Sequence, residues 1–201
     1  MNVRDSEAVG ALLDAAGHER VQEEGDAELV IVNSCTVRDM AERKAIGKCG
    51  NLIAVKEGRG KASEGGKVQL VGLMGCAVKR MGAEVFKALP GLDFAVGPRR
   101  FGLIPRLVAR CRAGETHLLE LPDDDEVPSG LDAHAGPSGG QTGFACYQSY
   151  VTVLLGCDNR CTYCIIPDVR GHEYSRPARE VVAEVGALAA RGVREVCLLG
   201  Q

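Results

Sequence analysis

Apolar positions along the chain follow two alternating patterns, short uninterrupted runs and longer helical stripes. The runs predict strands, the first two of them buried on both faces, at 27–35 (AELVIVNSC), 68–76 (VQLVGLMGC) and 92–97 (LDFAVG). Helical stripes occupy 5–17, 37–57 and 101–114, and glycines close the first and the last of them. Strands that alternate with helices are typical of an open, mainly parallel α/β sheet.

The pattern breaks in the middle of the chain and then resumes. Residues 121–143 are acidic at first and then rich in Gly, Ser and Pro, which is typical of a linker. A strand at 150–156, a helix at 176–192 and a strand at 193–200 then predict one βαβ unit. We therefore expect an N-terminal α/β domain over 1–120, a linker over 121–148 and the start of a second domain over 149–201. One βαβ unit leaves a sheet edge open, so a larger parallel sheet or barrel is expected, with the chain ending inside it.

Composition and charge exclude several classes of protein. The 201 residues carry a formal net charge of −3, so no field of positive charge over the whole chain indicates a nucleic-acid partner, DNA included. No apolar run approaches the roughly 18 residues of a membrane span, and the first ten residues lack the apolar stretch of a signal peptide. We expect a soluble, cytoplasmic protein without a membrane partner.

Cysteine is the unusual residue, with nine in the chain. In a reducing compartment, clustered cysteines more often bind metal than form disulfides. Three of them lie within eight residues in the string GCDNRCTYCIIP, as Cys157, Cys161 and Cys164. This C-x3-C-x2-C pattern directly follows a predicted strand, and a loop can turn all three thiolates toward one point.

The spacing alone leaves two metal sites open. Thiolates select zinc or the iron of an iron–sulfur cluster. Structural zinc takes four protein ligands, and His172 is the nearest candidate for a fourth. Three cysteines on a [4Fe–4S] cluster would instead leave one iron open for chemistry. A zinc-stabilised module and an electron-transfer iron–sulfur protein are therefore the alternatives to an enzyme.

The motif, with Tyr163 before the third cysteine, resembles the signature of the radical S-adenosylmethionine (SAM) superfamily. The wider string GCDNRCTYCIIPDVRGHEYSRP is similar to its methylthiotransferase family. MNVRDSE, LVIVNSCTVRDMAERKA, VGLMGCAVKR and FAVGPRR resemble successive motifs of that family's N-terminal domain. The resemblance covers nearly the whole chain except the linker.

The resemblance implies a role for each matching residue in the second domain. Cys157, Cys161 and Cys164 would hold a [4Fe–4S] cluster whose fourth iron binds SAM. Other residues are implied to bind this cofactor: Tyr163 near the adenine, Gly200 and Gln201 at the strand end that meets the methionine moiety, and Arg170 and Arg176 at SAM or substrate. For Tyr163 a packed loop aromatic, and for the two arginines an ordinary structural role, stay open as alternatives.

The family's N-terminal domain is implied to hold a second, auxiliary [4Fe–4S] cluster. Cys35 and Cys76 match two of its three ligands, each at the end of a predicted strand, and parallel strands deliver such ends to one edge. The third ligand would fall just before Met1. The sequence therefore looks truncated at both ends, and an auxiliary cluster with two ligands is expected to be poorly held or unoccupied.

The remaining cysteines and the scattered basic residues are expected to have ordinary structural or surface roles. Cys49 and Cys111 lie in predicted helices, Cys197 in a predicted strand and Cys146 beside the linker. The basic residues that are candidates for phosphate contacts are Lys79, Arg80, Arg99 and Arg100, although scattered surface charge explains them equally.

The resemblance also implies a substrate and partners. LLGQ and SRP look most like the branch that adds a methylthio group to C2 of N6-isopentenyladenosine beside the tRNA anticodon. One SAM would donate the methyl group and another would supply the radical, with a flavodoxin-type protein as electron donor. The other branches act on threonylcarbamoyl-adenosine in tRNA or on a ribosomal-protein aspartate. We expect these 201 residues to be inactive by themselves, since most of the barrel would be missing.

Overall fold

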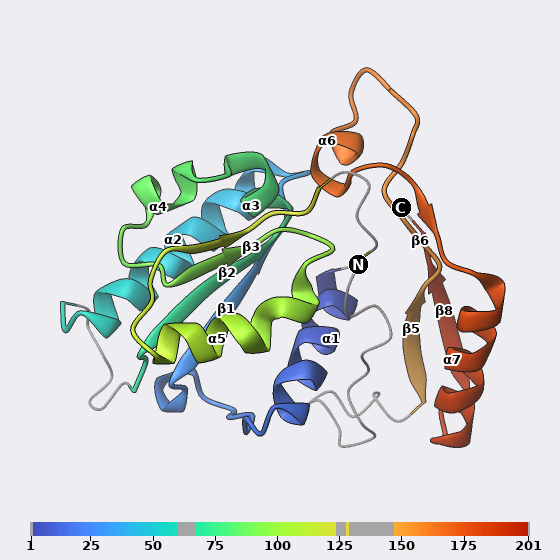
Figure 1. Ribbon diagram of the computed structural model, residues 1–201, viewed down its shortest axis with the longest axis horizontal. Coiled ribbons are helices and arrows are strands. Elements are labelled where there is room, and N and C mark those ends of the chain that lie inside the picture. Colours follow the sequence, from blue (N-terminus) through green and yellow to red (C-terminus); the bar gives the residue numbers. More distant parts are fainter. Residues whose placement is uncertain (1, 60–66, 124–127, 129–146, 201) are drawn as a thin grey trace.

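The protein is described by a computed structural model, with an N-terminal and a C-terminal part (Figure 1). The described residues are 2–59, 67–123, 128 and 147–200. The N-terminal part contains a four-stranded sheet, and the C-terminal part contains two sheets of two strands each. Predicted site residue Gln201 and Cys146 lie outside the described residues, as does most of the predicted linker.

All strands of the N-terminal sheet are parallel, as the alternation of strands and helices predicted. Their order in the sheet follows the sequence: β1 (Leu29–Ser34), β2 (Leu70–Gly75), β3 (Phe94–Val96) and β4 (Leu118–Glu120). The sequence did not reveal β4, because three residues after a helix make too short a run to stand out. The mixed α/β fold class is confirmed.

Helices cover both faces of this sheet and make a three-layer structure (Figure 1). On one face, α2 (Asp39–Lys56), α3 (Cys76–Met81) and α4 (Glu84–Ala88) contribute to a core that includes Cys49, Leu73 and Val85. On the other, α1 (Asn2–Ala15) and α5 (Ile104–Arg112) pack around Phe94 and Met74. Single 3-10 turns, η1 (Glu24–Asp26) and η2 (Phe101–Leu103), precede β1 and α5.

The first strand is less buried than its sequence predicted. The expectation of burial on both faces holds for β2, but β1 is an edge strand whose first five residues are only half-buried. The run of Val and Ile indicates a strong preference for a strand. It does not indicate whether neighbouring elements will cover that strand. The prediction was therefore right about the element and wrong about its burial.

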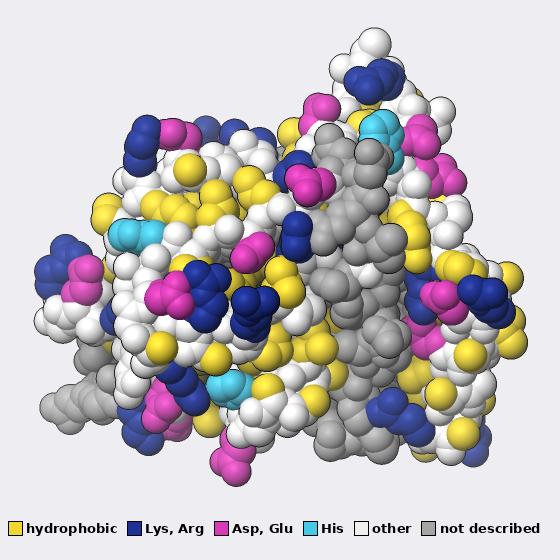
Figure 2. All heavy atoms as spheres, in the orientation of Figure 1, with side chains coloured by type: hydrophobic (Ala, Val, Ile, Leu, Met, Phe, Trp, Pro, Cys, Tyr) yellow, Lys and Arg dark blue, Asp and Glu magenta, His cyan; other side chains and the backbone are white. Residues whose placement is uncertain are grey.

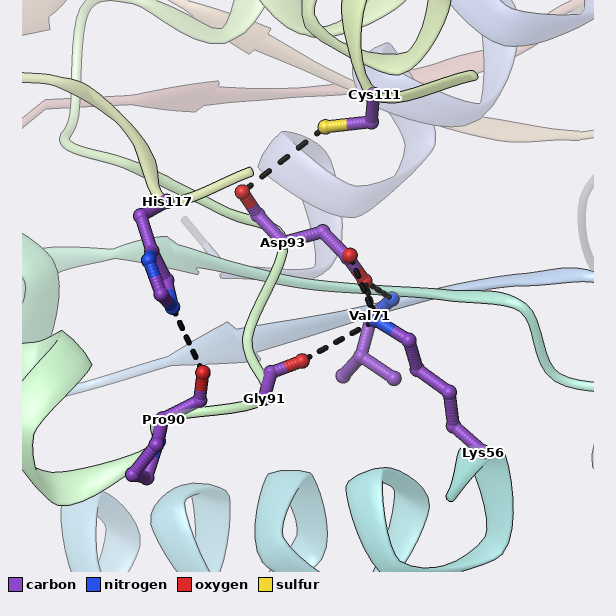
Figure 3. Close-up of polar contacts among 7 residues, drawn as sticks. All are labelled: Lys56, Val71, Pro90, Gly91, Asp93, Cys111 and His117. Carbon is purple, nitrogen blue, oxygen red and sulfur yellow. Dashed lines mark hydrogen bonds and ion pairs between the residues drawn. The ribbon is translucent and has the colours of Figure 1, made fainter. Parts of the chain in front are cut away.

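A buried aspartate ties three elements together at the amino ends of the strands (Figure 3). The Asp93 carboxylate accepts hydrogen bonds from Lys56 Nζ at 2.6 and 2.7 Å and from Val71 N at 2.7 Å. The Asp93 carbonyl accepts a contact from Cys111 Sγ at 3.9 Å, and nearby His117 Nε2 hydrogen-bonds Pro90 O at 2.7 Å. Lys56 lies in the last turn of α2, where the helix dipole also favours a positive charge. This cluster anchors the edge of the sheet opposite to the one that bears Cys35 and Cys76.

The C-terminal part contains the predicted βαβ unit. Strands β5 (Gln148–Thr152) and β8 (Glu195–Leu199) pair in parallel, and α7 (Ala178–Ala190) connects them. The predicted strand 150–156 is interrupted at Val153, whose N–H donates to Leu199 O at 2.8 Å. Beyond that residue, β6 (Leu154–Leu155) pairs in antiparallel fashion with β7 (Tyr174–Ser175). Between these two short strands lie the cysteine loop and α6 (Ile166–Arg170).

Part of the C-terminal βαβ unit is uncovered. Leu198 on β8 is 58% exposed and Val182 on α7 is 70% exposed. Such exposure of large apolar side chains is what the open sheet edge of a lone βαβ unit predicts. The domain boundaries themselves stay a prediction. In the described part of the chain, no helix has the length and apolar character to cross a membrane.

Two groups of buried ionic contacts join the N-terminal and C-terminal parts. Asp5 on α1 pairs with Arg170 at the end of α6, with Oδ2 and Nη2 3.3 Å apart. Arg4, which directly precedes Asp5 on α1, lies 4.0 Å from Glu184 on α7, and Glu184 also pairs with Arg176 at 2.6 Å. All five side chains are at most 11% exposed. Breaking such a pair therefore leaves an uncompensated buried charge. Specific charge pairs therefore help to hold the two parts together.

Candidate metal centres

Cys157, Cys161 and Cys164 lie on the loop between β6 and α6, as predicted. The loop begins at Gly156, which has φ 77°, and a Cβ there would be 2.1 Å from His172 O and 2.4 Å from Gly171 O. Only glycine fits this close approach, which also lets Cys157 N donate to Gly171 O at 3.2 Å. The first cysteine is thereby held against the turn that follows α6.

The three thiols are free and accessible, but their side chains do not converge. Cys161 is exposed, and Cys157 and Cys164 are half-buried. Cys164 N donates to Cys161 O at 3.0 Å, which closes a turn, and Asn159 Nδ2 lies 3.5 Å from Cys157 Sγ. Within residues 2–59, 67–123 and 147–200, no three His, Cys, Asp or Glu side chains are arranged to hold a metal ion. The donor set nevertheless suits an iron–sulfur cluster, because three thiols sit on a loop free of regular structure whose side chains can turn.

A pocket of about 540 Å³ adjoins this loop and reaches the N-terminal part. Its charged lining combines both signs, from Lys79, Asp158, Arg160, Asp168 and His172, beside Cys157. Figure 2 shows charged side chains of both signs and a histidine gathered above α6, at the top of the view. A pocket with this lining suits a small zwitterionic or multiply charged ligand better than an apolar one.

His172, the candidate for a fourth zinc ligand, is paired with a carboxylate. Its Nδ1 lies 2.9 Å from Asp158 Oδ1. The hydrogen bond from His172, with another from the Glu173 N–H, lowers the pKa of Asp158 below its ordinary value. His172 lines the same pocket as Cys157 but does not complete a metal-binding group with the cysteines in the described residues.

The remaining predicted SAM-site residues differ in their exposure and in their neighbours. Tyr163 is 91% exposed, so it is not a packed loop aromatic. Gly200 follows β8, and a Cβ there would come no closer than 3.7 Å to Leu154 Cβ. Arg176 is buried and donates from Nη1 to Thr152 O at 2.8 Å. Arg170 is 4% exposed and is directed toward the N-terminal part.

Cys35 and Cys76 lie side by side at the carboxyl ends of β1 and β2, as the parallel topology predicted. The two strands are in register to their ends, where Ser34 pairs with Gly75. Gly75 has φ 105°, and a Cβ there would be 2.3 Å from Ser34 O, so glycine is required before Cys76. Cys76 is 3% exposed and Cys35 is half-buried.

Arg170 is the neighbour of this cysteine pair that sequence reasoning missed. Burial raises the pKa of the Cys76 thiol, and the positive charge of Arg170 opposes that rise. Cys35 is close enough for its charge to act on Cys76 as well. Asp5, within the motif MNVRDSE, holds Arg170 from the other side, so α1 contributes to the same group of side chains.

The other cysteines and basic residues have mainly structural placements. Burial raises the pKa of Cys49 to about 12 and that of Cys111 to about 11, as expected of inert core thiols, and Cys197 is half-buried in β8. Arg99 is buried and its Nε donates to Arg170 O at 2.9 Å. Arg80 pairs with Glu42, and Lys79 Nζ donates to Pro122 O at 2.9 Å.

Two family models match separate stretches of the chain. Residues 1–97 match the family model described as uncharacterized protein family UPF0004, and residues 151–201 match that of the radical SAM superfamily. The first match contains Cys35 and Cys76, and the second contains the whole cysteine loop.

Curated relatives match over the entire chain. Those from Maricaulis maris and Geobacter metallireducens are 37% and 38% identical over 201 residues, and one from Opitutus terrae is 38% identical over 230. Each is named tRNA-2-methylthio-N(6)-dimethylallyladenosine synthase. The chain spans 42% to 45% of the length of these relatives.

Two solved structures of one enzyme share the fold of this chain. Two structures of TsrM from Kitasatospora setae, titled a radical S-adenosylmethionine methyltransferase, superpose with TM-scores of 0.52 and 0.51 at 17% and 15% identity. They cover 99% of this chain and 40% and 41% of theirs. At that identity the likeness establishes a shared arrangement of helices and strands alone.

Proposed function

The chain belongs to the radical SAM methylthiotransferase family, and from that premise we propose that it serves in methylthiolation of tRNA. The product would be the 2-methylthio derivative of N6-isopentenyladenosine beside the anticodon. One SAM would supply the methyl group and another the radical. The observation that carries the proposal is the presence in one chain of two separate cysteine groups, Cys157–Cys161–Cys164 on a loop and Cys35–Cys76 at a sheet edge.

The loop cysteines would hold a [4Fe–4S] cluster through their thiolates. When bound, such a cluster together with SAM supplies the electron that cleaves the sulfonium into methionine and a 5′-deoxyadenosyl radical. The chain's own contribution is to orient the nucleoside and the amino-acid end of SAM. Exposed Tyr163 offers a ring face for the adenine, and the charged pocket beside Cys157 offers partners of both signs for an amino and a carboxylate group.

The second cysteine group would take part in delivering sulfur. Cys35 and Cys76 present two thiols at one edge of the sheet. Gly200, directly after β8, and Gln201, the next residue in the sequence, would meet the methionine moiety of SAM. Arg176 would hold the end of β5 in place through its hydrogen bond to Thr152 O. A flavodoxin-type protein is the proposed electron donor.

The proposed substrate rests on the names of the relatives, each of which refers to dimethylallyladenosine. Because these 201 residues are expected to be inactive by themselves, the test expresses the complete gene that encodes them, at its full length, in a bacterium that lacks its own tRNA methylthiotransferases. Digested tRNA is then analysed by mass spectrometry. We expect the methylthio group on isopentenyladenosine, and its complete loss with Cys161→Ala. Cys197→Ala, a cysteine outside both groups, is the matched control.

Three results would contradict the proposal in different ways. A methylthio group on threonylcarbamoyl-adenosine, or on a ribosomal-protein aspartate, would assign the chain to another branch of the family. Methylthiolation that persists in Cys161→Ala would show that this loop cysteine is not required for the reaction. The absence of any methylthio group in tRNA and ribosomal protein would overturn the proposed activity altogether.

A further inference from the structure

Arg99, a candidate for phosphate contacts in the sequence, is instead a buried arginine in a backbone conformation that arginine rarely adopts. It lies in the loop between β3 and η2, has φ 72° and is only 5% exposed. A non-glycine residue with positive φ carries backbone strain, and such strain persists only where the surroundings hold it. Burial of a guanidinium is also unfavourable unless its donors are used. Both costs must be offset by what the side chain contacts.

The Arg99 side chain reaches into the C-terminal part and holds a turn there. Its Nε donates to Arg170 O at 2.9 Å, and its Nη2 donates to His172 O. These two carbonyls flank Gly171 in the turn that follows α6. A planar guanidinium presents its donors in a rigid fork, so one side chain holds both sides of the turn. Because Arg99 follows β3, the contact fixes this turn relative to the carboxyl edge of the N-terminal sheet.

The same turn positions the first cysteine of the loop. Cys157 N donates to Gly171 O at 3.2 Å, between the two carbonyls that Arg99 holds. The fit is close at Gly156, where a Cβ would lie 2.1 Å from His172 O and 2.7 Å from Arg99 Nη2. The guanidinium therefore lies against the backbone at which the cysteine loop begins.

The turn also carries one wall of the charged pocket beside Cys157. His172 lines this pocket, and its Nδ1 lies 2.9 Å from Asp158 Oδ1. Lys79 on α3 lines the pocket from the N-terminal part. Residues from two parts of the chain can face one ligand only if the two parts keep a fixed separation. Arg99 is a contact that joins the two parts at this point.

We propose that Arg99 is a positioning residue of the loop site, which holds the turn 170–172 so that Cys157 and the pocket wall at His172 are in place for SAM. The inference rests on the proposed function, in which this loop and pocket take the cluster and SAM, and it names the residue of the N-terminal part that sets them. Preorganisation of this kind strengthens ligand binding, because less ordering is left to occur on binding. Arg99 acts through main-chain carbonyls and needs no contact with either group.

The first measurement needs no metal. The complete protein, expressed from the gene at its full length, is freed of metal by a chelator, reduced and treated with iodoacetamide, and tandem mass spectrometry gives the rate at each cysteine. The main variant is Arg99→Gly, because glycine tolerates φ 72° and only the side chain is lost. We expect Cys157 to react about tenfold faster in this variant, the change that loss of a hydrogen bond to a charged group can produce. Exposed Cys161 and buried Cys49 should react as in the wild type.

Two further variants separate the side chain from its charge. Arg99→Lys keeps the charge but not the fork of donors, so Cys157 should react at a rate between those of the wild type and Arg99→Gly. Arg106→Met removes an exposed arginine of α5 and is the matched control, which should react as the wild type does.

The second measurement concerns SAM binding. The same proteins are reconstituted anaerobically, iron is measured, and SAM is titrated while electron paramagnetic resonance of the reduced cluster is followed. We expect equal iron in the wild type and Arg99→Gly, and an apparent Kd for SAM about tenfold higher in the variant. A residue needed only for stability would change thermal unfolding without a change in this Kd.

Each part of the inference has a result that would overturn it. Unchanged reactivity of Cys157 in Arg99→Gly would overturn the role of Arg99 at the turn, even with a SAM-responsive cluster on the loop. Equal acceleration at Cys49 would show a general loss of structure and overturn a role confined to the turn. Unchanged affinity for SAM would overturn the role in SAM binding. A wild-type protein without a SAM-responsive cluster would overturn the proposed function and that role with it, whereas the rates at Cys157 in metal-free protein would still decide whether Arg99 holds the turn.

Discussion

The two cysteine groups of this chain differ in how far the fold prepares them for a metal. Cys35 and Cys76 lie at the ends of paired strands, where a backbone register and a required glycine set their positions, and Cys76 is almost completely buried. Cys157, Cys161 and Cys164 lie on a loop without regular structure, and Cys161 is exposed. A strand-end site obtains its geometry from the sheet, whereas a loop site obtains it from the metal that it binds. Substitutions in the strand-end site are therefore expected to lower the stability of the metal-free protein. Substitutions in the loop site are expected to lower the metal content and to change the stability little.

The largest expected difference between the two cysteine groups is in whether a single alanine substitution removes bound iron or lowers stability. Cys161→Ala is expected to abolish the iron bound by the loop and to leave thermal unfolding of the metal-free protein unchanged, because an exposed thiol packs against little. Cys76→Ala is expected to lower the free energy of unfolding of the metal-free protein by roughly 1 kcal/mol, since it empties a buried position. Iron analysis and chemical denaturation of both variants measure the contrast. Loss of stability in Cys161→Ala equal to that in Cys76→Ala would remove the distinction.

The second contrast is in thiol reactivity. In metal-free protein at pH 8, iodoacetamide should modify Cys161 at least about tenfold faster than Cys76, because Cys161 is exposed and burial raises the pKa of Cys76. Mass spectrometry of tryptic peptides gives both rates in one sample. Cys49, with a pKa raised to about 12 by burial, serves as the slow internal control. Similar rates for Cys161 and Cys76 would show that the strand-end site is open.

The third contrast concerns the glycines that precede each group. Gly75→Ala and Gly156→Ala each place a Cβ within 2.3 Å of a backbone carbonyl oxygen, at φ 105° and 77°. We expect each substitution to cost about 1–3 kcal/mol, measured by denaturant unfolding. Gly186→Ala in α7, where a Cβ meets nothing within 4 Å, is the matched control and should be neutral or slightly stabilising. A loss in Gly186→Ala as large as in the other two would point to a general effect of added methyl groups.

The smallest expected effect is a pH dependence beside the strand-end site. Burial raises the pKa of Glu42, but hydrogen bonds from Arg80 and Thr36 outweigh it and leave the pKa below its ordinary value of 4.5. A carboxyl whose pKa is lowered by folding stabilises the folded state above about pH 4.5, and this contribution disappears as the pH falls through the lowered pKa. It should amount to less than about 1 kcal/mol.

Unfolding free energies of wild type and Glu42→Gln between pH 3 and 7 test this directly. The difference between the two proteins should be largest near pH 7 and should shrink toward pH 3. A difference that stays constant over the whole range would show that the carboxylate charge of Glu42 is not the cause.

Much of this arrangement could be predicted from the sequence because it depends on local patterns. The apolar runs predicted β2 and β3, and the helix between two apolar runs predicted the parallel pair β5 and β8. The end of each strand predicted that Cys35 and Cys76 lie together. In these cases the residues that form the element, or the connectivity that places it, are adjacent in the chain.

The features that escaped prediction depend on neighbours distant in the sequence. Burial of β1 depends on its place at the sheet edge, and β4 and β7 are only three and two residues long. Arg170 reaches Asp5 across 165 positions, so no local pattern distinguishes it from a surface arginine. Its unusual environment became visible only with the packing of α1 and α3 against α6.

The most direct test of the account is whether the loop binds a cluster that responds to SAM. Iron and sulfide are measured after anaerobic reconstitution of the wild-type chain and of the variant with Cys157, Cys161 and Cys164 changed to Ala. Electron paramagnetic resonance of the reduced proteins is then recorded with and without SAM. The account predicts a [4Fe–4S] signal that shifts on addition of SAM and is missing from the variant. Stoichiometric zinc without iron in the wild type, or a SAM-induced shift that survives in the variant, would contradict it.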